Sequence, residues 1–262
     1  MRVNGVMLGL LVTLILVAVA VLLATGANFS GQDRAHVLAA GSLQHPAGTD
    51  ALGRDRLIRV SAAFLISLAG AAVASILTTV AAAIIGALAA FASGITGWLI
   101  VLICDVFLAL PWLFLLMMVR SALPLNTSPG VSATITFLVL AALGWPACAR
   151  AVYRGTFKLK RADWMVQARA SGLRSGQLVR NVIPNLLPLL LPQFLVCVPA
   201  FVMAEANLGA LGLGIGEPLP SWGGMLLELQ NSAMLLETRW VFFPIALLCL
   251  VLLLLEGVTV EA

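Results

Sequence analysis

Charged side chains are scarce in this sequence. Asp, Glu, Lys and Arg make up 10% of its 262 residues and hydrophobic residues 61%, whereas a soluble globular domain is about 25% charged. This shortage excludes an ordinary soluble protein and predicts a chain that has lipid as its solvent. Its length allows one polytopic domain with about five to seven membrane spans.

Residues that commonly bind metals or catalyse reactions are also few. The four cysteines lie in apolar stretches without C-x-x-C spacing, so we interpret them as core thiols. The two histidines, His36 and His45, share a segment with Asp33 and Asp50, but this spacing does not suggest converging ligands, and we expect no metal site. The motifs G-x-x-x-x-G-K-[ST], H-E-x-x-H and G-x-S-x-G are absent. We therefore expect no catalytic residue, no cofactor and no nucleotide site in this chain.

Long apolar stretches are what the sequence has in abundance. A helix needs about 20 apolar residues to cross the hydrocarbon of a bilayer. The ranges that qualify are 6–25, 60–92, 98–119, 131–149, 183–205 and 240–256. The first also resembles a signal peptide, but it is long enough to span, and we expect it to be retained. The prediction is an all-α integral membrane protein with six transmembrane helices in a single domain, residues 1–262.

Positive charge is concentrated between the fourth and fifth of these stretches. Eight of the 15 Lys and Arg residues lie from Arg150 to Arg180, where only Asp163 opposes them. The positive-inside bias places this loop, residues 150–182, in the cytoplasm. Both termini are then cytoplasmic, and the outer segments are 26–59, 120–130 and 206–239. No aromatic-basic surface accompanies the charge, so we expect the loop to contact a soluble protein rather than nucleic acid.

Two of the apolar stretches have unusual compositions. The range 60–92 is too long for a simple span, so its first turns, near 59–68, are expected to lie along the interface. Its Ala, Ser and Gly residues predict close packing within a helix bundle. The range 183–205 contains four prolines, which bend a helix and predict that it lines a pathway, with simple kinking as the alternative. They are Pro184, Pro188, Pro192 and Pro199.

Two carboxylates lie near or within apolar stretches. Asp105 is two turns into the third stretch, and Glu205 closes the fifth. An ionised carboxylate facing lipid costs at least about 2.5 kcal/mol, so both should face protein or water. For Asp105 we favour a structural role, pairing with a partner subunit or with backbone freed by Pro111, over contact with a solute in a pathway. Glu205 is placed at the outer interface.

Four motifs in order along the chain point to one family. Residues 163–173 read D-W-M-V-Q-A-R-A-S-G-L, and Ile183-Pro184-Asn185 follows. Residues 204–226 read A-E-A-N-L-G-A-L-G-L-G-I-G-E-P-L-P-S-W-G-G-M-L, and residues 45–55 read H-P-A-G-T-D-A-L-G-R-D. Gly144-Trp145-Pro146 with Arg150 enters the basic loop. Together they resemble the ABC importer permeases of the dipeptide/oligopeptide/nickel transport family. The H-P-x-G-T-D version resembles the second, "C"-type, permease subunit.

This resemblance implies a fold, partners and site residues. The fold is that of a type I ABC importer permease in a bacterial cytoplasmic (inner) membrane. It implies a homologous second permease, with a heterodimer expected, two ABC ATPase subunits that carry ATP and Mg²⁺, and an extracytoplasmic solute-binding protein. In such permeases two short cytoplasmic helices bracket a glycine and rest on the ATPase. The implied function is ATP-driven alternating access that moves peptides or a similar small solute.

The site residues follow by position. Those implied to dock the ATPase are Asp163, Trp164, Gln167, Ala168, Arg169, Ala170, Gly172 and Leu173. Those implied to transmit its movement are Ile183, Pro184, Asn185 and Pro188. Those implied in an outer loop or gate are Glu205, Gly212, Gly214, Pro218, Pro220, Ser221, Trp222 and Gly223, with an ordinary capping loop as the alternative.

The sequence also departs from this family's pattern. Val166 stands where an acidic residue often opens the cytoplasmic signature, and Gln167 replaces a small residue. A non-transporting membrane scaffold that has lost its coupling to the ATPase is therefore one alternative. A gradient-driven secondary transporter is another, although paired half-repeats and several intramembrane ionisable groups are absent from the sequence. The identity of the solute stays open.

Overall fold

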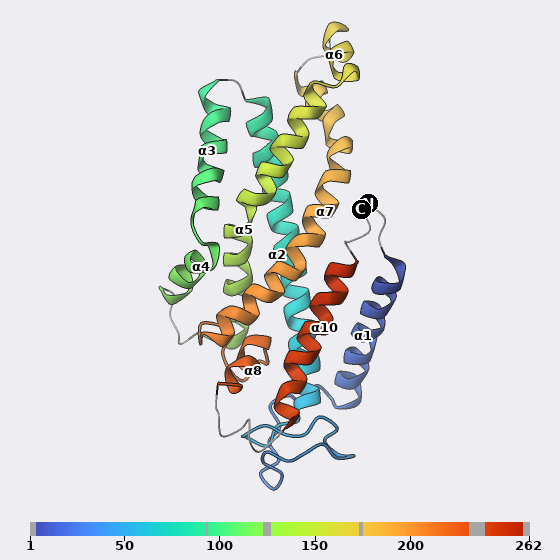
Figure 1. The fold of residues 1–262 in the computed structure, drawn as a ribbon, viewed down its shortest axis with the longest axis vertical. Helices are drawn as coiled ribbons and strands as arrows, with labels where there is room; N and C mark the ends of the chain where they lie inside the picture. Colours follow the sequence, from blue (N-terminus) through green and yellow to red (C-terminus); the bar gives the residue numbers. More distant parts are fainter. Residues whose placement is uncertain (1–3, 93, 123–126, 173–174, 231–238, 259–262) are drawn as a thin grey trace.

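The computed structural model describes residues 4–92, 94–122, 127–172, 175–230 and 239–258. Within these ranges the chain consists of helices joined by turns and loops (Figure 1). The elements are α1 (Gly5–Ala24), α2 (Arg56–Phe91), α3 (Ile95–Ala109), α4 (Trp112–Ser121), α5 (Pro129–Lys160), α6 (Asp163–Ala170), α7 (Ser175–Ala210), α8 (Trp222–Glu228), η1 (Arg239–Phe242) and α10 (Phe243–Gly257).

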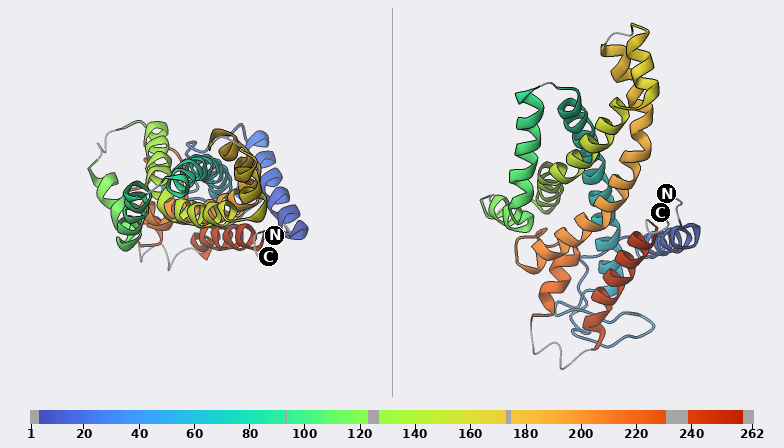
Figure 2. Two further views of the ribbon diagram at one scale, coloured as in Figure 1. Left: turned by 90° about the horizontal axis from the view of Figure 1, so that it is seen from above. Right: turned by 45° about the horizontal axis from the view of Figure 1, so that its top comes forward.

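Helix α2 is the centre of the bundle. It packs against α1, α3, α5, α7 and α8, and Figure 2 shows these helices grouped around it when the molecule is seen along its long axis. Its buried face carries mainly small residues, such as Ala71, Ser75 and Ala82. Small side chains allow helix backbones to approach closely in lipid. The predicted packing of this stretch within a bundle is confirmed.

No break in α2 marks off the turns near 59–68, whose position along the interface stays a prediction. Helix α2 runs without interruption over 36 residues from Arg56. The Asp55 side chain caps its start by accepting hydrogen bonds from the N–H groups of Leu57 and Ile58. At 1.5 Å per residue such a helix is about 54 Å long. The hydrocarbon is only about 30 Å thick, so α2 extends well beyond it.

The single helix predicted over 98–119 is wrong. The structure divides this range into α3 and α4, which are bent by 83° at Leu110 and Pro111. Proline has no N–H for the helical ladder, and its ring disfavours helical backbone at the preceding residue. Leu110 accordingly has extended backbone angles. The pair forms either a broken span or a re-entrant segment.

The stretch between the fourth and fifth predicted spans is more helical than a loop. Helix α5 continues past residue 149 to Lys160, and α7 begins at Ser175. Only residues 161–174 separate the ends of these helices, and α6 occupies most of that interval. Much of the predicted loop, residues 150–182, is therefore helical, while its boundaries at the membrane stay a prediction.

Four described helices are long and apolar enough to cross a membrane: α1, α2, α5 and the part of α7 from Asn185 to Ala210. The α3–α4 pair makes a fifth if it is counted as one broken span. Helix α10, which covers most of the predicted sixth span, is apolar but has only 15 residues. The chain is therefore a multi-pass helical protein, while the count of six spans and the cytoplasmic termini stay predictions.

The two predicted functional ends lie at opposite ends of the bundle. Helix α6 projects at one end, and the segment 26–55 covers the other (Figure 1). Helices α1 and α10 pack side by side, and Gly257 near the end of α10 lies beside Met7 near the start of α1. The arrangement keeps the first and last described helices together on one flank of α2.

Candidate functional site

Among the described side chains of helix α6, one is buried against the bundle. Met165 is fully buried, and it packs with Leu186 of α7 in a small apolar cluster that is separate from the main core. Residues from α2, α5 and α7 surround this pair: Ala87, Phe91, Leu159, Leu189 and Leu190. Helix α6 thus contacts a cluster to which α2, α5 and α7 all contribute.

A second contact ties α5 to α2 at this end. The Lys160 ammonium donates a hydrogen bond to the Ala90 carbonyl oxygen at 2.5 Å and lies 5.2 Å from the centre of the Phe91 ring. Lys160 is the last residue of α5, and Ala90 is in the last turn of α2. The cation therefore also binds an orphan carbonyl at a helix C-terminus, where positive charge is stabilising.

The residues predicted to dock a soluble partner form the outward face of α6 and the turn that follows. Asp163, Trp164, Gln167, Ala170 and Gly172 are exposed. The side chains of Ala168 and Arg169, and all of Leu173, lie outside the described residues. Gly172 has a φ of +81° and open space where a Cβ would be. The backbone angle, rather than packing, therefore favours glycine at this position.

The predicted transmission residues do not face the Met165 cluster where they are described. Asn185 and Pro188 are exposed on α7, and the side chains of Ile183 and Pro184 lie outside the described residues. The contact with α6 is made instead by Leu186. The sequence did not indicate the contact between Met165 and Leu186, because a single methionine in a polar helix resembles any surface methionine. The feature that could have revealed it is the position of Met165, an apolar residue opposite the polar face of α6.

On the far side of α6 the chain does not form a second short helix. After Gly172 and the following residues it enters α7, which continues for 36 residues to Ala210 through all four prolines. The first turns of α7 are therefore continuous with the candidate membrane span of that helix, Asn185–Ala210.

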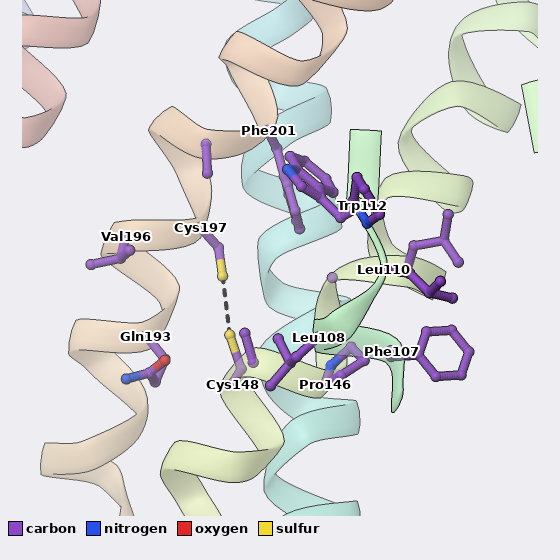
Figure 3. A pocket seen from close by; sticks show the side chains of 15 residues that line it. Phe107, Leu108, Leu110, Trp112, Pro146, Cys148, Gln193, Val196, Cys197 and Phe201 are labelled. Carbon is purple, nitrogen blue, oxygen red and sulfur yellow. Dashed lines mark hydrogen bonds between the residues drawn. The ribbon is translucent and has the colours of Figure 1, made fainter. Parts of the chain in front are cut away.

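A cavity of about 430 Å³ lies between the α3–α4 break, α5 and α7 (Figure 3). Its lining is mostly apolar and includes Phe107, Trp112 and Phe201, with Gln193 as a polar exception. Cys148 and Cys197 both line this cavity, and their Sγ atoms are 3.3 Å apart. The prediction that α7 borders a pathway is consistent with this position, because α7 supplies five of the lining residues.

Asp105 has a partner within this chain. Its carboxylate forms an ion pair with Arg150 of α5, so it joins α3 to α5 rather than neutralising backbone near Pro111. It does not line the 430 Å³ cavity. The position therefore agrees with the structural role preferred for Asp105, although the partner is an arginine that was assigned to the basic loop.

Glu205 faces protein, as predicted, while its place at the outer interface stays a prediction. It is fully buried one turn before the end of α7, which continues to Ala210, and the Ser67 hydroxyl of α2 donates a hydrogen bond to its Oε2 at 2.8 Å. The placement at the helix end was wrong because the sequence after Glu205 is rich in glycine but remains helical.

The outer-loop residues fold back onto α7 through glycines. A Cβ on Gly223, at the start of α8, would lie 2.2 Å from the Gly209 Cα in α7, and a Cβ on Gly214 would lie 2.4 Å from the same atom. Ser221 caps α8 by accepting a hydrogen bond from the Gly224 N–H at 3.1 Å, and Trp222 beside it is fully buried. Pro220 is also buried, whereas Gly212 and Pro218 are exposed.

A network of charges joins this loop to the segment before α2. The Arg54 guanidinium lies 2.6 Å from Asp50 and 2.8 Å from Glu217, and Arg59 lies 2.9 Å from Glu217. Arg54 and Arg59 are buried. Glu217 is thus an acid that Arg54 and Arg59 share.

Arg56 makes the same kind of connection to α8. It contacts Glu228 at 3.1 Å and donates to the Thr49 carbonyl oxygen at 3.1 Å. Burial raises the pKa of Glu228 above its ordinary value, and the charge of Arg56 opposes that increase. Buried charge of this kind is tolerated only when it is paired.

Arg120, at the end of α4, was not singled out by the sequence. It is buried, and it donates to the Ser132 hydroxyl at 2.5 Å and to the Gly214 carbonyl oxygen at 3.1 Å, while Nε and Nη1 have no partner. A pocket of about 240 Å³ adjoins it. Most buried polar groups in proteins have hydrogen-bond partners, so this arginine is unusual.

The expectation that the histidines do not converge is wrong. Ligand atoms of Asp33, His36 and His45 all lie within 4.8 Å of one another. Gly53 and Thr49, which are in the same segment, fold the chain back so that residues twelve positions apart meet. The hydrogen bond from the His36 imidazole lowers the pKa of the Asp33 carboxyl group below its ordinary value.

Comparison with known proteins adds a family. The model described as "Binding-protein-dependent transport system inner membrane component" matches residues 82–258, which is more than half of the chain. The "Oligopeptide transport system permease protein OppC" of Haemophilus influenzae is 29% identical over 210 residues, covering 79% of this chain and 65% of that protein.

Two further relatives are equally similar. The "Dipeptide transport system permease protein DppC" of Bacillus subtilis is 29% identical over 206 residues, which is 78% of this chain and 62% of that protein. The "Glutathione transport system permease protein GsiD" of Pectobacterium atrosepticum is 29% identical over 204 residues, which is 78% of this chain and 65% of that protein. The match thus spans less than two thirds of the length of each of these three relatives.

Proposed function

Because this chain belongs to the family of binding-protein-dependent transport system inner membrane components, we propose that it is a transmembrane permease subunit of an ATP-binding cassette importer. The observation that carries the proposal is the exposed helix α6, which packs through Met165 onto α2, α5 and α7. In the proposal this exposed helix transmits the movement of a separate ATPase and needs no catalytic side chain of its own.

In this proposal α6 rests on an ABC ATPase that binds ATP and Mg²⁺. When the two ATPases close on each other they displace α6, and Met165 transfers the displacement to Leu186 and hence to α7. Helix α7 is continuous from this contact to the cavity and on to the outer loop. Helix α7 therefore connects the ATPase contact, the proposed pathway and the outer gate.

The outer loop is proposed to act as the gate and to face a solute-binding protein. Support comes from the close Gly209–Gly223 approach and from the Arg54–Glu217 and Arg59–Glu217 ion pairs, which hold the loop against the segment before α2. In this proposal the contacts are made in the closed gate and broken in the open one.

A homologous second permease is proposed to cover the α3–α4 side. The cavity borders these two helices, and they expose large apolar side chains such as Trp98, Phe114 and Met118. Such surfaces are stable against lipid or against another apolar helix. The heterodimer is the expected form of this core, since the relatives carry the name of one particular subunit type.

The transported solute is proposed to be a peptide. The relatives' names refer to oligopeptides, dipeptides and glutathione, all of which carry carboxylates. The pocket next to Arg120 offers two guanidinium nitrogens without partners, and arginine binds carboxylates well. We assign this pocket to the carboxylate of an entering peptide.

The alternative of a scaffold that has lost coupling rests on Val166, which is exposed on α6 where an acid often stands in similar permeases. Peptide uptake separates the two functions. Cells that depend on this complex should lose uptake when residues 163–173 are deleted, although the variant still inserts into the membrane. Normal uptake by the deletion variant would contradict the docking role, and an intact complex that never couples ATP hydrolysis to uptake would favour the scaffold.

A further inference from the structure

Three metal-binding side chains converge on the segment before α2. The His36 Nδ1 lies 2.8 Å and the His45 Nε2 lies 3.8 Å from the same oxygen, Oδ2 of Asp33. The two imidazole rings are 6.1 Å apart, centre to centre. We propose that Asp33, His36 and His45 bind one divalent transition-metal ion of the Zn²⁺ type. This inference is independent of the transport function.

The orientation of His45 supports this assignment. Its Nδ1 lies 2.9 Å from Oδ2 of Asp55, so the ring is held with Nε2 directed at Asp33. In metal sites a ligating histidine usually donates its other ring N–H to a carboxylate, which fixes the tautomer and the ring. Asp55 is itself fixed, because its Oδ1 caps α2.

The backbone of each ligand is also held in place. The Asp33 N–H donates to the Gly53 carbonyl oxygen at 2.9 Å, and a Cβ on Gly53 would lie only 2.0 Å from the Asp33 carbonyl oxygen. The Thr49 hydroxyl donates to the His36 carbonyl oxygen. The Gly48 N–H donates to the His45 carbonyl oxygen at 2.9 Å. The ligands are thus positioned by contacts that do not involve a metal, as a preorganised site requires.

The ligand chemistry selects the type of ion. Two imidazoles and one carboxylate suit Zn²⁺, Co²⁺ or Ni²⁺, whereas Mg²⁺ and Ca²⁺ prefer oxygen ligands. Three protein ligands leave a fourth tetrahedral position for water. The carboxylates of Asp33 and Asp55 offset the charge of a divalent ion. Because His36 is exposed and the other ligands are only partly buried, an ion has direct access from solvent.

Such an ion would join the loop that contains Asp33 and His36 to the turn that contains His45. These residues precede α2, and Asp55 links the site to the first turn of that helix. The metal therefore fastens the segment 33–45 to the start of the central helix, and its binding should raise the thermal stability of the chain.

The test uses the purified full-length chain in nanodiscs, with a purification tag free of histidine. Cys249, the exposed thiol, is changed to Ala to exclude binding there. Isothermal titration with Zn²⁺ should show one site per chain, and Co²⁺ should give the visible absorption of a tetrahedral nitrogen/oxygen site. Millimolar Mg²⁺ should not displace either ion.

His36→Ala is the decisive variant, because its exposed side chain can be removed with little effect on folding. We expect it to weaken Zn²⁺ binding at least 100-fold and to abolish the Zn²⁺-dependent rise in melting temperature. The matched control is Arg34→Ala, an exposed neighbour, which should leave both unchanged. Absence of saturable 1:1 binding, or equal affinity in the His36→Ala variant and the parent, would overturn the proposal.

Discussion

Arg54 and Glu217 are 163 positions apart in the sequence, yet the Arg54 Nη1 lies 2.8 Å from the Glu217 Oε2. The contact joins the segment before α2 to the loop that follows α7. The arginine side chain is largely buried, while the glutamate is more than half exposed. Solvent therefore weakens the pair, but the buried guanidinium needs the acid.

Removing this contact should loosen the loop. In a double-mutant cycle of Arg54→Ala and Glu217→Ala, we expect a coupling energy of about 1 kcal/mol in thermal unfolding. Arg54 retains Asp50 as a partner, which limits the loss. A coupling energy indistinguishable from zero would mean that Glu217 does not hold the loop.

Met165→Ala tests the connection between α6 and the bundle. Truncating a fully buried methionine costs about 2 kcal/mol or more, and the loss falls on the contact with Leu186. In proteoliposomes that contain the assembled complex, we expect fewer peptides imported per ATP hydrolysed. Val166→Ala is the matched control, since that neighbour is exposed. Equal ratios for the two variants would exclude Met165 as the link.

Gly172 should tolerate only residues that adopt positive φ. Its φ of +81° costs an ordinary L-residue about 1 to 2 kcal/mol, and proline, fixed near −65°, cannot adopt it. We expect Gly172→Pro to abolish uptake with normal membrane insertion, and Gly172→Asn to retain most uptake because asparagine accepts this conformation. If the proline variant transports normally, the turn is not required.

Gly223→Ala should separate α8 from α7. The added Cβ would meet the Gly209 backbone at 2.2 Å, and backbone cannot move aside as a side chain does, so we expect a loss of about 1 to 3 kcal/mol in stability. Gly216→Ala in the same loop is the control, because nothing lies within 4 Å of its Cβ position. The melting temperatures of the two variants in detergent provide the comparison.

Arg120→Met distinguishes function from stability. Replacing a buried, incompletely paired charge by an apolar side chain of similar size is often neutral or stabilising. We therefore expect an unchanged or higher melting temperature together with reduced uptake of peptides that carry a free carboxylate. A stable variant with full uptake would remove Arg120 from the transport path.

Composition and motifs were sufficient to predict the class of fold and the family. Helix α1 lies within one residue of the range expected from hydropathy alone, and the ordered motifs identified a permease. Both signals are local in the sequence, so no knowledge of tertiary contacts was needed. Pro111 also gave a local signal for the α3–α4 break, but its effect on a long apolar stretch was underestimated.

The contacts that build the candidate sites were not predictable in the same way. Glu217 meets Arg54, and Met165 meets Leu186, only because distant segments pack together. The convergence of His36 and His45 depends on hydrogen bonds within an irregular loop, where no periodicity indicates which side chains meet. Glu205 was misplaced because glycine-rich sequence after it suggested a loop, whereas packing against α2 and α8 keeps it helical.

Cross-linking from α6 in the assembled complex tests whether this chain contacts the ATPase as a permease subunit does. Gln167, exposed on α6, is changed to Cys in a background that carries Cys249→Ala, and a bifunctional reagent is applied to membranes that contain the co-expressed ATPase. We expect a cross-link between Gln167→Cys and the ATPase. Labelling of that cysteine by a membrane-impermeant maleimide added outside intact cells, with no cross-link to the ATPase, would contradict it.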